Sequence, residues 1–478
     1  MEGSAAKKPI KTGGPDTVLR LHLAKAGLPD KPAAAWMKAR PKFGKSFSRD
    51  ADTGKKFWRD STALIAMLPP KAKRTPDQQV AAQNLLHAVR RSREDFLTSH
   101  ADTVYRKLTN NHAKFLRVDE LCYAAAKLVP GLTPAQTDVN AEAELMQSEK
   151  DGVEVDQGIF LSHVLADAGN GMHLCHAMLL PKPQSDELAM RFLKDGLVDL
   201  GPARIERKGQ AAILTISNPR YLNAEDDGTL AETEALADAA ILDGLNQICV
   251  LRGGVVEHPR YQGRNIFSAG INLTHLYRGK IPFLWYITRD MGVVNKMFRG
   301  VAREDIGPEE TKGGTREKPW VAQLDVFAIG GGCQYLLAMD YVVAGADAYM
   351  TLPARKEGII PGAANLRLTR FVGARAARQA IMMGRRFDCD TPEGKMICDI
   401  VVPPDQVEIA TMKVCDDFTS SGVVSAASNR RAFRIGEESL DDFRRYMAVY
   451  CREQAYCHFS PALIANLEKH WNAANRKM

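Results

Sequence analysis

The feature that most constrains the fold is an alternation of short apolar strands and helices that begins near residue 201. "ARIERKGQAAILTISNP" predicts two strands around a Lys-Gly turn, "LAETEALADAAILDGL" an amphipathic helix, and "QICVLRGG" a buried strand. The same order repeats through "KPWVAQLDVFAIGGG", the helix after it, "YVVAGADAYMTL" and the helix "AARQAIMMG". This alternation is typical of an α/β layered core, which we assign to residues 201–402.

Three other regions flank this core in the sequence. Residues 1–50 are rich in Lys, Pro, Gly and Ala without sustained periodicity, which predicts a mobile tail or surface arm. Residues 51–200 carry apolar side chains at spacings of three and four, which predicts an all-helical region. Residues 403–478 are again helical, and the apolar stripe of residues 441–471 requires a partner surface.

The composition disfavours several classes of protein. With 478 residues, 45% of them apolar and 25% charged, the chain has the composition of a soluble globular protein. No stretch reaches the roughly 18 apolar residues of a membrane span, and the first 20 residues lack the apolar segment of a secretion signal. Nine cysteines, an odd number, indicate reduced thiols and predict the cytoplasm. The scattered net charge of +7 favours an anionic small molecule over nucleic acid.

Three consecutive glycines, 330–332, lie between a predicted strand and a predicted buried helix. They let the backbone approach a ligand, and the free N–H groups of the first helical turn favour negative charge. Neither GxxxxGK[ST] nor GxGxxG is present, which disfavours triphosphate and dinucleotide binding. The alternative is that the glycines only permit tight packing. A second stretch, "GRNIFSAGINL", has an Ala-Gly pair, and N–H groups from two such loops form an oxyanion hole.

Four ordered motifs resemble the crotonase, or enoyl-CoA hydratase/isomerase, superfamily. They are "NPRYLNAE", "IFSAGIN", "AIGGGCQYLLAMDYVVAGADAYMTLP" and "GIIPGAANLRLTRFVG", within residues 201–478. The resemblance implies a core of stacked ββα turns, a C-terminal helical oligomerisation region, assembly as homotrimers or dimers of trimers, and an acyl-CoA substrate. It also implies an oxyanion hole for the thioester enolate, formed by the backbone N–H groups of Ile271 and Gly331.

The departures from the family pattern narrow the reaction. Hydratases of the superfamily have glutamates where this chain has Gln334 and Ala354, and an aspartate is common at Asn272. A glutamine cannot exchange a proton with water near neutral pH, so hydration lacks its general acid and base. Hydratase activity is therefore disfavoured, and the sequence does not identify the base that takes the Cα proton.

Within the superfamily, the long helical N-terminal region, "GGGCQ", "EGIIPGAANLR" and "WYITRDMG" resemble the cofactor-independent dioxygenases that act on (3,5-dihydroxyphenyl)acetyl-CoA in antibiotic biosynthesis. The resemblance implies that an arylacetyl-CoA and O₂ become an arylglyoxylate and CoA, with no metal, no flavin, and no nucleic-acid or membrane partner. It implies that Glu225, Arg289 and Gln334 bind the dihydroxyphenyl group. The alternative for Arg289 is a solvated position on a helix face.

The resemblance also predicts residues along CoA and around the reacting atoms. Arg220 would face a CoA phosphate, although an ordinary surface arginine explains it equally well. The two isoleucines of "GIIPG" would form an apolar wall for O₂, although core packing explains them too. The predicted set is Arg220, His258, Pro259, Arg260, Tyr261, Ala269, Gly270, Asn272, Leu273, Thr274, Ile359, Ile360, Pro361 and Gly362.

Other functions remain open or are disfavoured. A thioesterase or isomerase could use the same oxyanion hole, and a non-catalytic relative could bind acyl-CoA or RNA. "HLCH" (173–176) and "CREQAYCH" (451–458) lack the paired spacing of zinc sites, so core or interface residues are predicted there. No GxSxG elbow supports a serine hydrolase. The charged stretch "REDIGPEETKGGTREK" predicts a solvated insertion.

Overall fold

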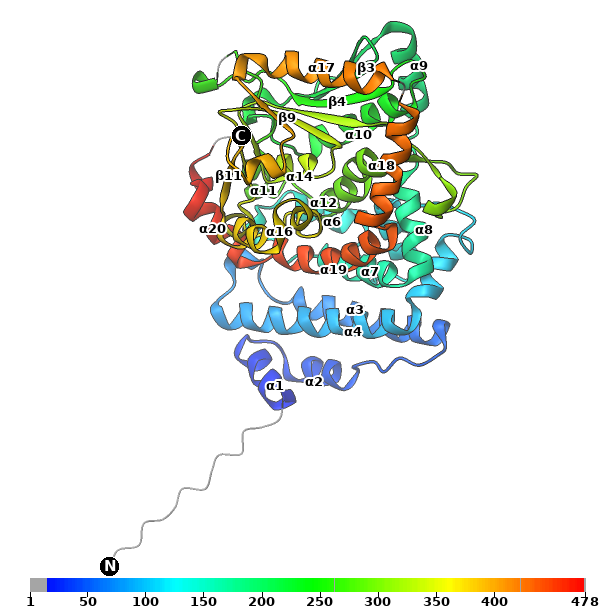
Figure 1. Cartoon of the computed structure of the whole chain (residues 1–478). Helices are drawn as coiled ribbons and strands as arrows, with labels where there is room; N and C mark the ends of the chain where they lie inside the picture. The colour runs from blue at the N-terminus through cyan, green and yellow to red at the C-terminus, as the bar shows by residue number, and fades with distance from the viewer. Residues whose placement is uncertain (1–14, 262, 422, 477–478) are drawn as a thin grey trace, which may run out of the picture. The chain divides into compact units, whose positions relative to one another are not determined.

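A computed structural model describes residues 15–261, 263–421 and 423–476 (Figure 1). Contacts divide the chain into two compact units, residues 1–101 with 129–132 and residues 102–128 with 133–478. The long helix α4 (Pro76–Leu108) contributes to both units. The domain boundaries predicted near residues 50, 200 and 402 stay predictions. In the described part of the chain, no helix combines the length and apolar character needed to cross a membrane.

The first unit is helical. Its helices are α1 (Pro15–Lys25), α2 (Asp30–Lys38), α3 (Phe47–Ile65), the turn η1 (Lys71–Lys73) and most of α4. Residues 15–38 fall within the predicted arm, yet they form two helices because Leu23 and Trp36 are buried. The Trp36 ring stacks on Phe57 at 5.5 Å and its Nε1 donates to Ser61 Oγ at 2.7 Å. Residues 1–14 of the arm lie outside the described residues, and its mobility stays a prediction.

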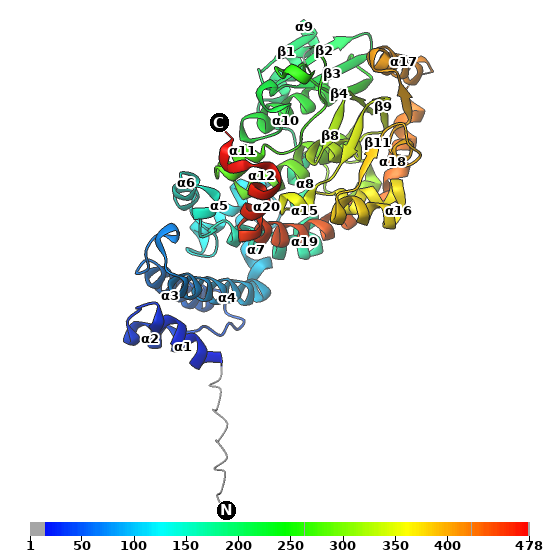
Figure 2. The same ribbon diagram turned by 90° about the vertical axis from the view of Figure 1, so that its left-hand side faces the viewer.

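The second unit contains a seven-stranded sheet in the order β1-β2-β3-β4-β7-β9-β12. Its first three strands are antiparallel and the rest are parallel. This arrangement confirms the predicted α/β core and the strand pair around the Lys-Gly turn. The helix α17 (Val407–Ser420) covers one face and α10 (Asp227–Leu242) the other (Figures 1 and 2). The strands are β1 (Leu197–Asp199), β2 (Ala203–Lys208), β3 (Ala211–Ile216), β4 (Ile248–Gly253), β7 (Trp320–Leu324), β9 (Tyr341–Gly345) and β12 (Ile400–Val402).

Two stretches predicted as single strands each contain two strands. After β7 the chain bends at Val326, whose φ of 60° is rare for a β-branched residue, and continues as β8 (Phe327–Ile329). After β9 it bends again and continues as β10 (Tyr349–Thr351). A second sheet has the order β11-β10-β8, with β11 spanning Arg386–Asp388. The bend turns the glycine run away from the first sheet, and α14 (Gly331–Leu336) starts there.

The helix α10 is buried on most of its surface, so its predicted amphipathic character is wrong. Glu234 and Asp238 lie inside the protein and both pair with the buried Lys296, at 2.9 and 2.8 Å. Lys296 belongs to α13 (Asn295–Arg299), which continues α12 (Phe283–Arg289) through the π-helical turn η5 (Asp290–Val294). Mutual pairing removes the cost of burying these charges alone.

The C-terminal helices include α19 (Leu440–His458), which packs against α7 (Val155–Ala166) of the same chain (Figure 2). The approach is close, because a Cβ on Gly158 would lie 2.5 Å from Ala455 Cβ. The apolar stripe predicted to need a partner surface therefore finds one within the chain, while oligomerisation stays a prediction. The remaining helices of this unit are α5 (Val118–Leu128), α6 (Gln136–Ala143), α8 (Ala168–Leu179), α9 (Ser185–Asp195), α11 (Leu273–Tyr277), α15 (Ala354–Glu357), α16 (Ala364–Met383), α18 (Val424–Glu437) and α20 (Pro461–Trp471).

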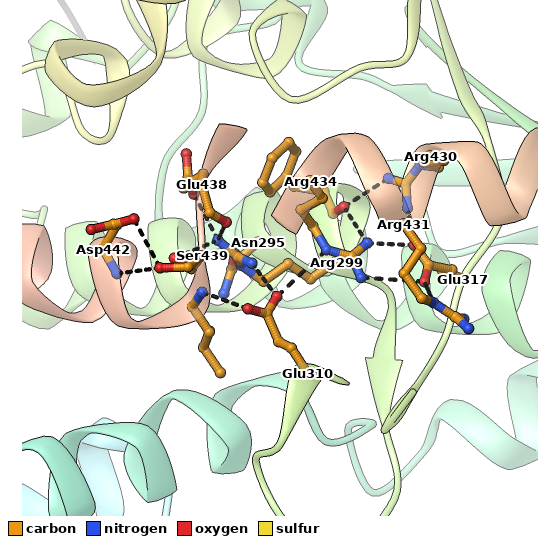
Figure 3. A network of polar contacts seen from close by, with 12 residues as sticks. Asn295, Arg299, Glu310, Glu317, Arg430, Arg431, Arg434, Glu438, Ser439 and Asp442 are labelled. Carbon is orange, nitrogen blue, oxygen red and sulfur yellow. Dashed lines mark hydrogen bonds and ion pairs between the residues drawn. The ribbon is translucent and has the colours of Figure 1, made fainter. Parts of the chain in front are cut away.

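A polar network links the segment after α13 to α18 and α19 (Figure 3). Glu310 accepts from Arg299 at 2.5 Å and from the Leu440 N–H at 2.6 Å. Glu317, at the end of the same segment, accepts from Arg430 and Arg434 at 2.5 Å each. The prediction of a solvated insertion is therefore wrong for both glutamates, because each meets arginines brought from elsewhere in the chain.

The two His- and Cys-containing stretches, residues 173–176 and 451–458, contribute to the core, as predicted. The Nε2–H of His173 donates to the His112 carbonyl at 3.0 Å, and its Nδ1 accepts from the Tyr105 hydroxyl at 2.8 Å. Cys175 and Cys451 are buried, and burial raises the pKa of the Cys175 thiol to about 12. Among the described residues, no group of three or more His, Cys, Asp or Glu side chains is placed to hold a metal ion.

Candidate active site

Two cavities adjoin one another where the glycine run and the "SAGIN" loop meet. The outer cavity has a volume of about 380 Å³ and the inner one about 20 Å³. Ile271 and Glu357 line both cavities. A ligand that filled both would therefore pass between these two residues.

The two predicted oxyanion-hole donors lie on segments that touch. The Glu225 N–H donates to the Gly270 carbonyl at 2.7 Å, and the Asn272 N–H donates to the Glu225 carbonyl at 2.8 Å. This pattern leaves the intervening Ile271 N–H pointing away from its neighbouring segment. Gly331 is the first residue of α14, so its N–H has no partner within the helix. Throughout the described parts of the chain, neither N–H has a recorded hydrogen-bond acceptor.

Gly270 permits the close approach of these two segments. Its φ is +81°, a conformation that glycine adopts without strain. A Cβ at this position would lie 2.5 Å from the Ile329 carbonyl oxygen and 3.0 Å from the Gly331 nitrogen. The backbones therefore meet only because residue 270 has no side chain.

Arg289 lies behind the second donor loop and is fully enclosed by polar groups. Its Nε and one terminal nitrogen donate to the Glu225 carboxylate at 2.9 and 2.8 Å, and that terminal nitrogen also donates to the Gly331 carbonyl at 2.8 Å. The other terminal nitrogen donates to Gln334 Oε1 at 2.7 Å and to Asp290 at 3.3 Å. The alternative of a solvated arginine on a helix face is therefore wrong.

The charges in this cluster compensate one another. Burial would lower the pKa of Arg289, but Glu225, Tyr335 and Asp290 raise it well above its usual value. Burial raises the pKa of Asp290, against the opposing effect of Arg289. The Tyr335 hydroxyl donates to Glu225 Oε1 at 2.7 Å. Arg289 and Gln334 line the inner cavity, whereas Glu225 is not among the described residues that line either cavity.

The predicted apolar wall lines the inner cavity. Ile359, Ile360, Pro361 and Gly362 all contribute to it. Gly362 is required there, because a Cβ would lie 2.3 Å from Gln334 Oε1. A volume of about 20 Å³ accommodates little more than one water molecule, so an aryl ring enters only if side chains of the wall move.

Most of the residues predicted to bind CoA line the outer cavity. Those that do are Arg220, His258, Ala269, Asn272, Leu273 and Thr274. Gly270 acts through its close backbone contact, as described above. Pro259, Arg260 and Tyr261 form the turn η4 beside this cavity without lining it, and the Tyr261 ring packs against Phe327 at 5.6 Å.

The site contains residues that the sequence did not indicate. Asp290 and Tyr450 line the inner cavity, and Tyr335 holds Glu225. Glu357 is the last residue of the short helix α15, four positions after Pro353. A lone glutamate in "ARKEG" gives no signal by itself, and Tyr450 comes from α19, which is far away in the sequence.

Comparison with known proteins identifies the family of this chain. The sequence model of the enoyl-CoA hydratase/isomerase family matches residues 289–443. The chain is 43% identical over 393 residues to (3,5-dihydroxyphenyl)acetyl-CoA 1,2-dioxygenase of Amycolatopsis orientalis, which covers 82% of this chain and 89% of the relative. The chain belongs to the crotonase, or enoyl-CoA hydratase/isomerase, family. An alignment of this length exceeds residues 201–478, so it extends into the helical N-terminal region of this crotonase.

More distant relatives match a shorter part of the chain. The short-chain-enoyl-CoA hydratase of Clostridium acetobutylicum is 25% identical over 241 residues, 50% of this crotonase and 83% of the hydratase. A crystal structure of an enoyl-CoA hydratase from Mycobacterium avium subsp. paratuberculosis covers 56% of this chain and 98% of its own, with 18% identity and a TM-score of 0.47.

Proposed function

We propose that this crotonase is a dioxygenase that converts an arylacetyl-CoA and O₂ into an arylglyoxylate and CoA. The carrying observation is the pair of free N–H groups at Ile271 and Gly331, at the junction of the two cavities. The outer cavity has space for part of CoA, and the identity of 43% to a (3,5-dihydroxyphenyl)acetyl-CoA 1,2-dioxygenase supports the same substrate.

The chemistry starts at the carbon between the thioester and the ring. Removal of one Cα proton leaves an enolate, whose oxygen accepts hydrogen bonds from the two N–H groups. The enolate carbon transfers electrons to O₂ and forms a Cα–O bond, which gives a peroxide. The terminal peroxide oxygen attacks the thioester carbonyl carbon, and the C–S bond breaks to release CoA. Loss of the second Cα proton with cleavage of the O–O bond then gives the ketone and the carboxylate of the arylglyoxylate, so that both atoms of O₂ enter the product. A dihydroxyphenyl ring conjugated with the enolate is electron-rich, so we propose that neither metal nor flavin takes part.

The polar cluster favours this reaction over hydration. Gln334 stands where hydratases place an acid, and it accepts from Arg289 rather than exchanging protons. Arg289 donates to the Gly331 carbonyl and thereby fixes the peptide next to the second donor. We infer that Arg289 and Glu225 position this loop, while Gln334 and Asp290 remain available to ring hydroxyls.

The decisive experiment measures CoA release from (3,5-dihydroxyphenyl)acetyl-CoA by chelator-treated protein in air and under nitrogen. We expect release only with O₂, and with ¹⁸O₂ we expect two labelled oxygen atoms in the arylglyoxylate. CoA release that continues under nitrogen would identify a thioesterase, and double-bond migration in an enoyl-CoA an isomerase. Salt-sensitive RNA binding without any turnover would indicate a non-catalytic relative.

A further inference from the structure

Glu357 is a buried carboxylate without a countercharge. It is 4% exposed, and in the described part of the chain its carboxylate has no recorded hydrogen bond or ion pair. Burial raises the pKa of Glu357 to about 7. Leaving an ionisable group in this state costs stability, so a role in function is the simplest reason for its presence.

Glu357 lies at the border between the two cavities, where the proposed substrate would have its reacting carbon. Ile271 and Glu357 are the residues shared by the linings of the two cavities. A Cβ on Gly330, next to the donor Gly331, would lie 3.6 Å from Glu357 Oε1. A thioester oxygen at the two N–H groups and a ring in the inner cavity would put the Cα methylene at the border between the cavities, where Ile271 and Glu357 lie.

We propose that Glu357 is the base that takes the Cα proton of the acyl-CoA. The proton moves from Cα to a carboxylate oxygen of Glu357, the C–H electron pair becomes the enolate, and the negative charge moves to the oxygen held by Ile271 and Gly331. No bond to CoA breaks in this step. The inference rests on the proposed enolate chemistry and assigns the residue that performs its first step.

Asp290 is the competing carboxylate, and its surroundings disfavour it. It lines only the inner cavity and pairs with Arg289 at 3.3 Å. Arg289, which also pairs with Glu225 at 2.8 Å, opposes the rise that burial causes in the pKa of Asp290. Asp290 therefore has a countercharge and does not line the outer cavity, whereas Glu357 lies on the border between the two cavities.

Other titratable groups lie near Glu357, and a pH measurement must distinguish their ionisation from that of Glu357. On the inner side these are Tyr286, Arg289, Asp290 and Tyr450. On the outer side they are Arg220, Tyr221, His258 and Arg476, while Arg355 and Lys356 of α15 are exposed. Glu357 is among the groups that raise the pKa of Tyr286, so that tyrosine stays neutral in the range of interest.

The test is Cα hydrogen–deuterium exchange of (3,5-dihydroxyphenyl)acetyl-CoA in D₂O under nitrogen, followed by mass spectrometry. We expect Glu357→Gln to slow exchange by about 10²- to 10⁴-fold, the usual contribution of a general base, with substrate affinity retained in calorimetric titration. Glu154→Gln is the matched control, because Glu154 is also buried and has a pKa raised to about 7, yet lines neither cavity of the site. Unchanged exchange in Glu357→Gln would overturn the proposal.

Two further readouts use pH dependence, and the first of them can be measured on the wild type alone. In the wild type, the exchange rate should rise with pH through about 7 and then level off. A rate that does not change with pH would mean that another group is the base. The same conclusion would follow if Glu357→Gln kept the rise in rate around pH 7. Because the folded state holds the Glu357 proton more tightly than the unfolded chain, ionisation opposes folding as pH rises from about 4.5 to 7. Glu357→Gln should therefore raise the Tm at pH 8, and a lowered Tm would indicate a structural role instead.

Failure of this inference and failure of the proposed function give different results. If the wild type exchanges Cα deuterium through Glu357 but consumes no O₂, the base assignment holds and the dioxygenase proposal is wrong. If the wild type consumes O₂ and releases CoA while Glu357→Gln exchanges normally, the dioxygenase holds and the base lies elsewhere.

Discussion

Gln334 and Glu357 show how single residues determine what an oxyanion hole is used for. Gln334 is an amide where hydratases of the superfamily have an acid, and its Oε1 accepts from Arg289 at 2.7 Å. Glu357 places a carboxylate on the border between the two cavities. The first could be predicted, because the glycine run fixes its position in the motif. The second could not, because only the tertiary structure shows what surrounds it.

Gly270 offers a sharp test of the oxyanion hole. In Gly270→Ala the new Cβ would meet the Ile329 carbonyl at 2.5 Å and the Gly331 nitrogen at 3.0 Å. The two donor segments must move apart, so we expect kcat to fall by about 10²- to 10³-fold, as for the loss of one donor. The measurement is the steady-state rate of CoA release.

The matched control for this variant is Gly263→Ala. Gly263 has nearly the same φ, +79°, in the same loop region, but a Cβ there would meet nothing within 4 Å. It reports the cost of forcing alanine into positive φ without moving the donors. Equal losses of kcat in the two variants would contradict the role of Gly270 in closing the hole.

At the level of elements, three arginines from two helices, α13 and α16, hold α18 and α19 against the core. Glu438, between the two helices, accepts from Arg299 at 3.0 Å, from Arg367 at 2.9 Å and from Arg370. Burial by itself would raise the pKa of Glu438, but the arginines have the larger, opposite effect and lower this pKa to about 2. The α19 helix carries Tyr450 to the inner cavity, so this network supports the site from a distance.

Glu438→Gln should destabilise the protein by about 3 kcal/mol at pH 7, because one pKa unit corresponds to about 1.4 kcal/mol and buried arginines lose their partner. A lowered folded pKa contributes stability above pH 4.5 that is lost as pH falls towards 2. Denaturant unfolding at pH 7 and pH 3 should therefore show the difference from wild type shrinking at the lower pH. Asp305→Asn, which removes an exposed pair with Arg303, should change neither curve.

The local sequence predicted some strands correctly but missed where two strands bend. The patterns of "QICVLRGG" and of the two strands around Lys-Gly predicted β4, β2 and β3 correctly. The bend at Val326 was not predicted, since a β-branched residue at positive φ runs against local preference and is enforced by packing. The burial of α10 was also missed, because its charges find Lys296 from a later segment.

At the scale of the whole molecule, exposed apolar side chains bear on the predicted homotrimer. Phe433 on α18 is 67% exposed and Val449 on α19 is 63% exposed. Phe433→Lys should lower the sedimentation coefficient from that of the predicted trimer, because a charge in an apolar interface is costly. Met190→Lys, which changes an equally exposed residue of α9, is the control. A single species of monomer size in the wild type would refute the trimer itself.

The sequence by itself determined the α/β class and the crotonase family, and it predicted the two donor positions and the absence of the hydratase acids. Each of these depends on residues that are close together in the chain, so a motif or a hydrophobic period carries the information. Only the tertiary structure decided that Arg289 pairs with Glu225, Gln334 and Gly331, and that Glu357, with no recorded partner among the described residues, lies between two cavities. Those facts depend on contacts between distant segments, and burial and countercharge exist only once the chain has folded.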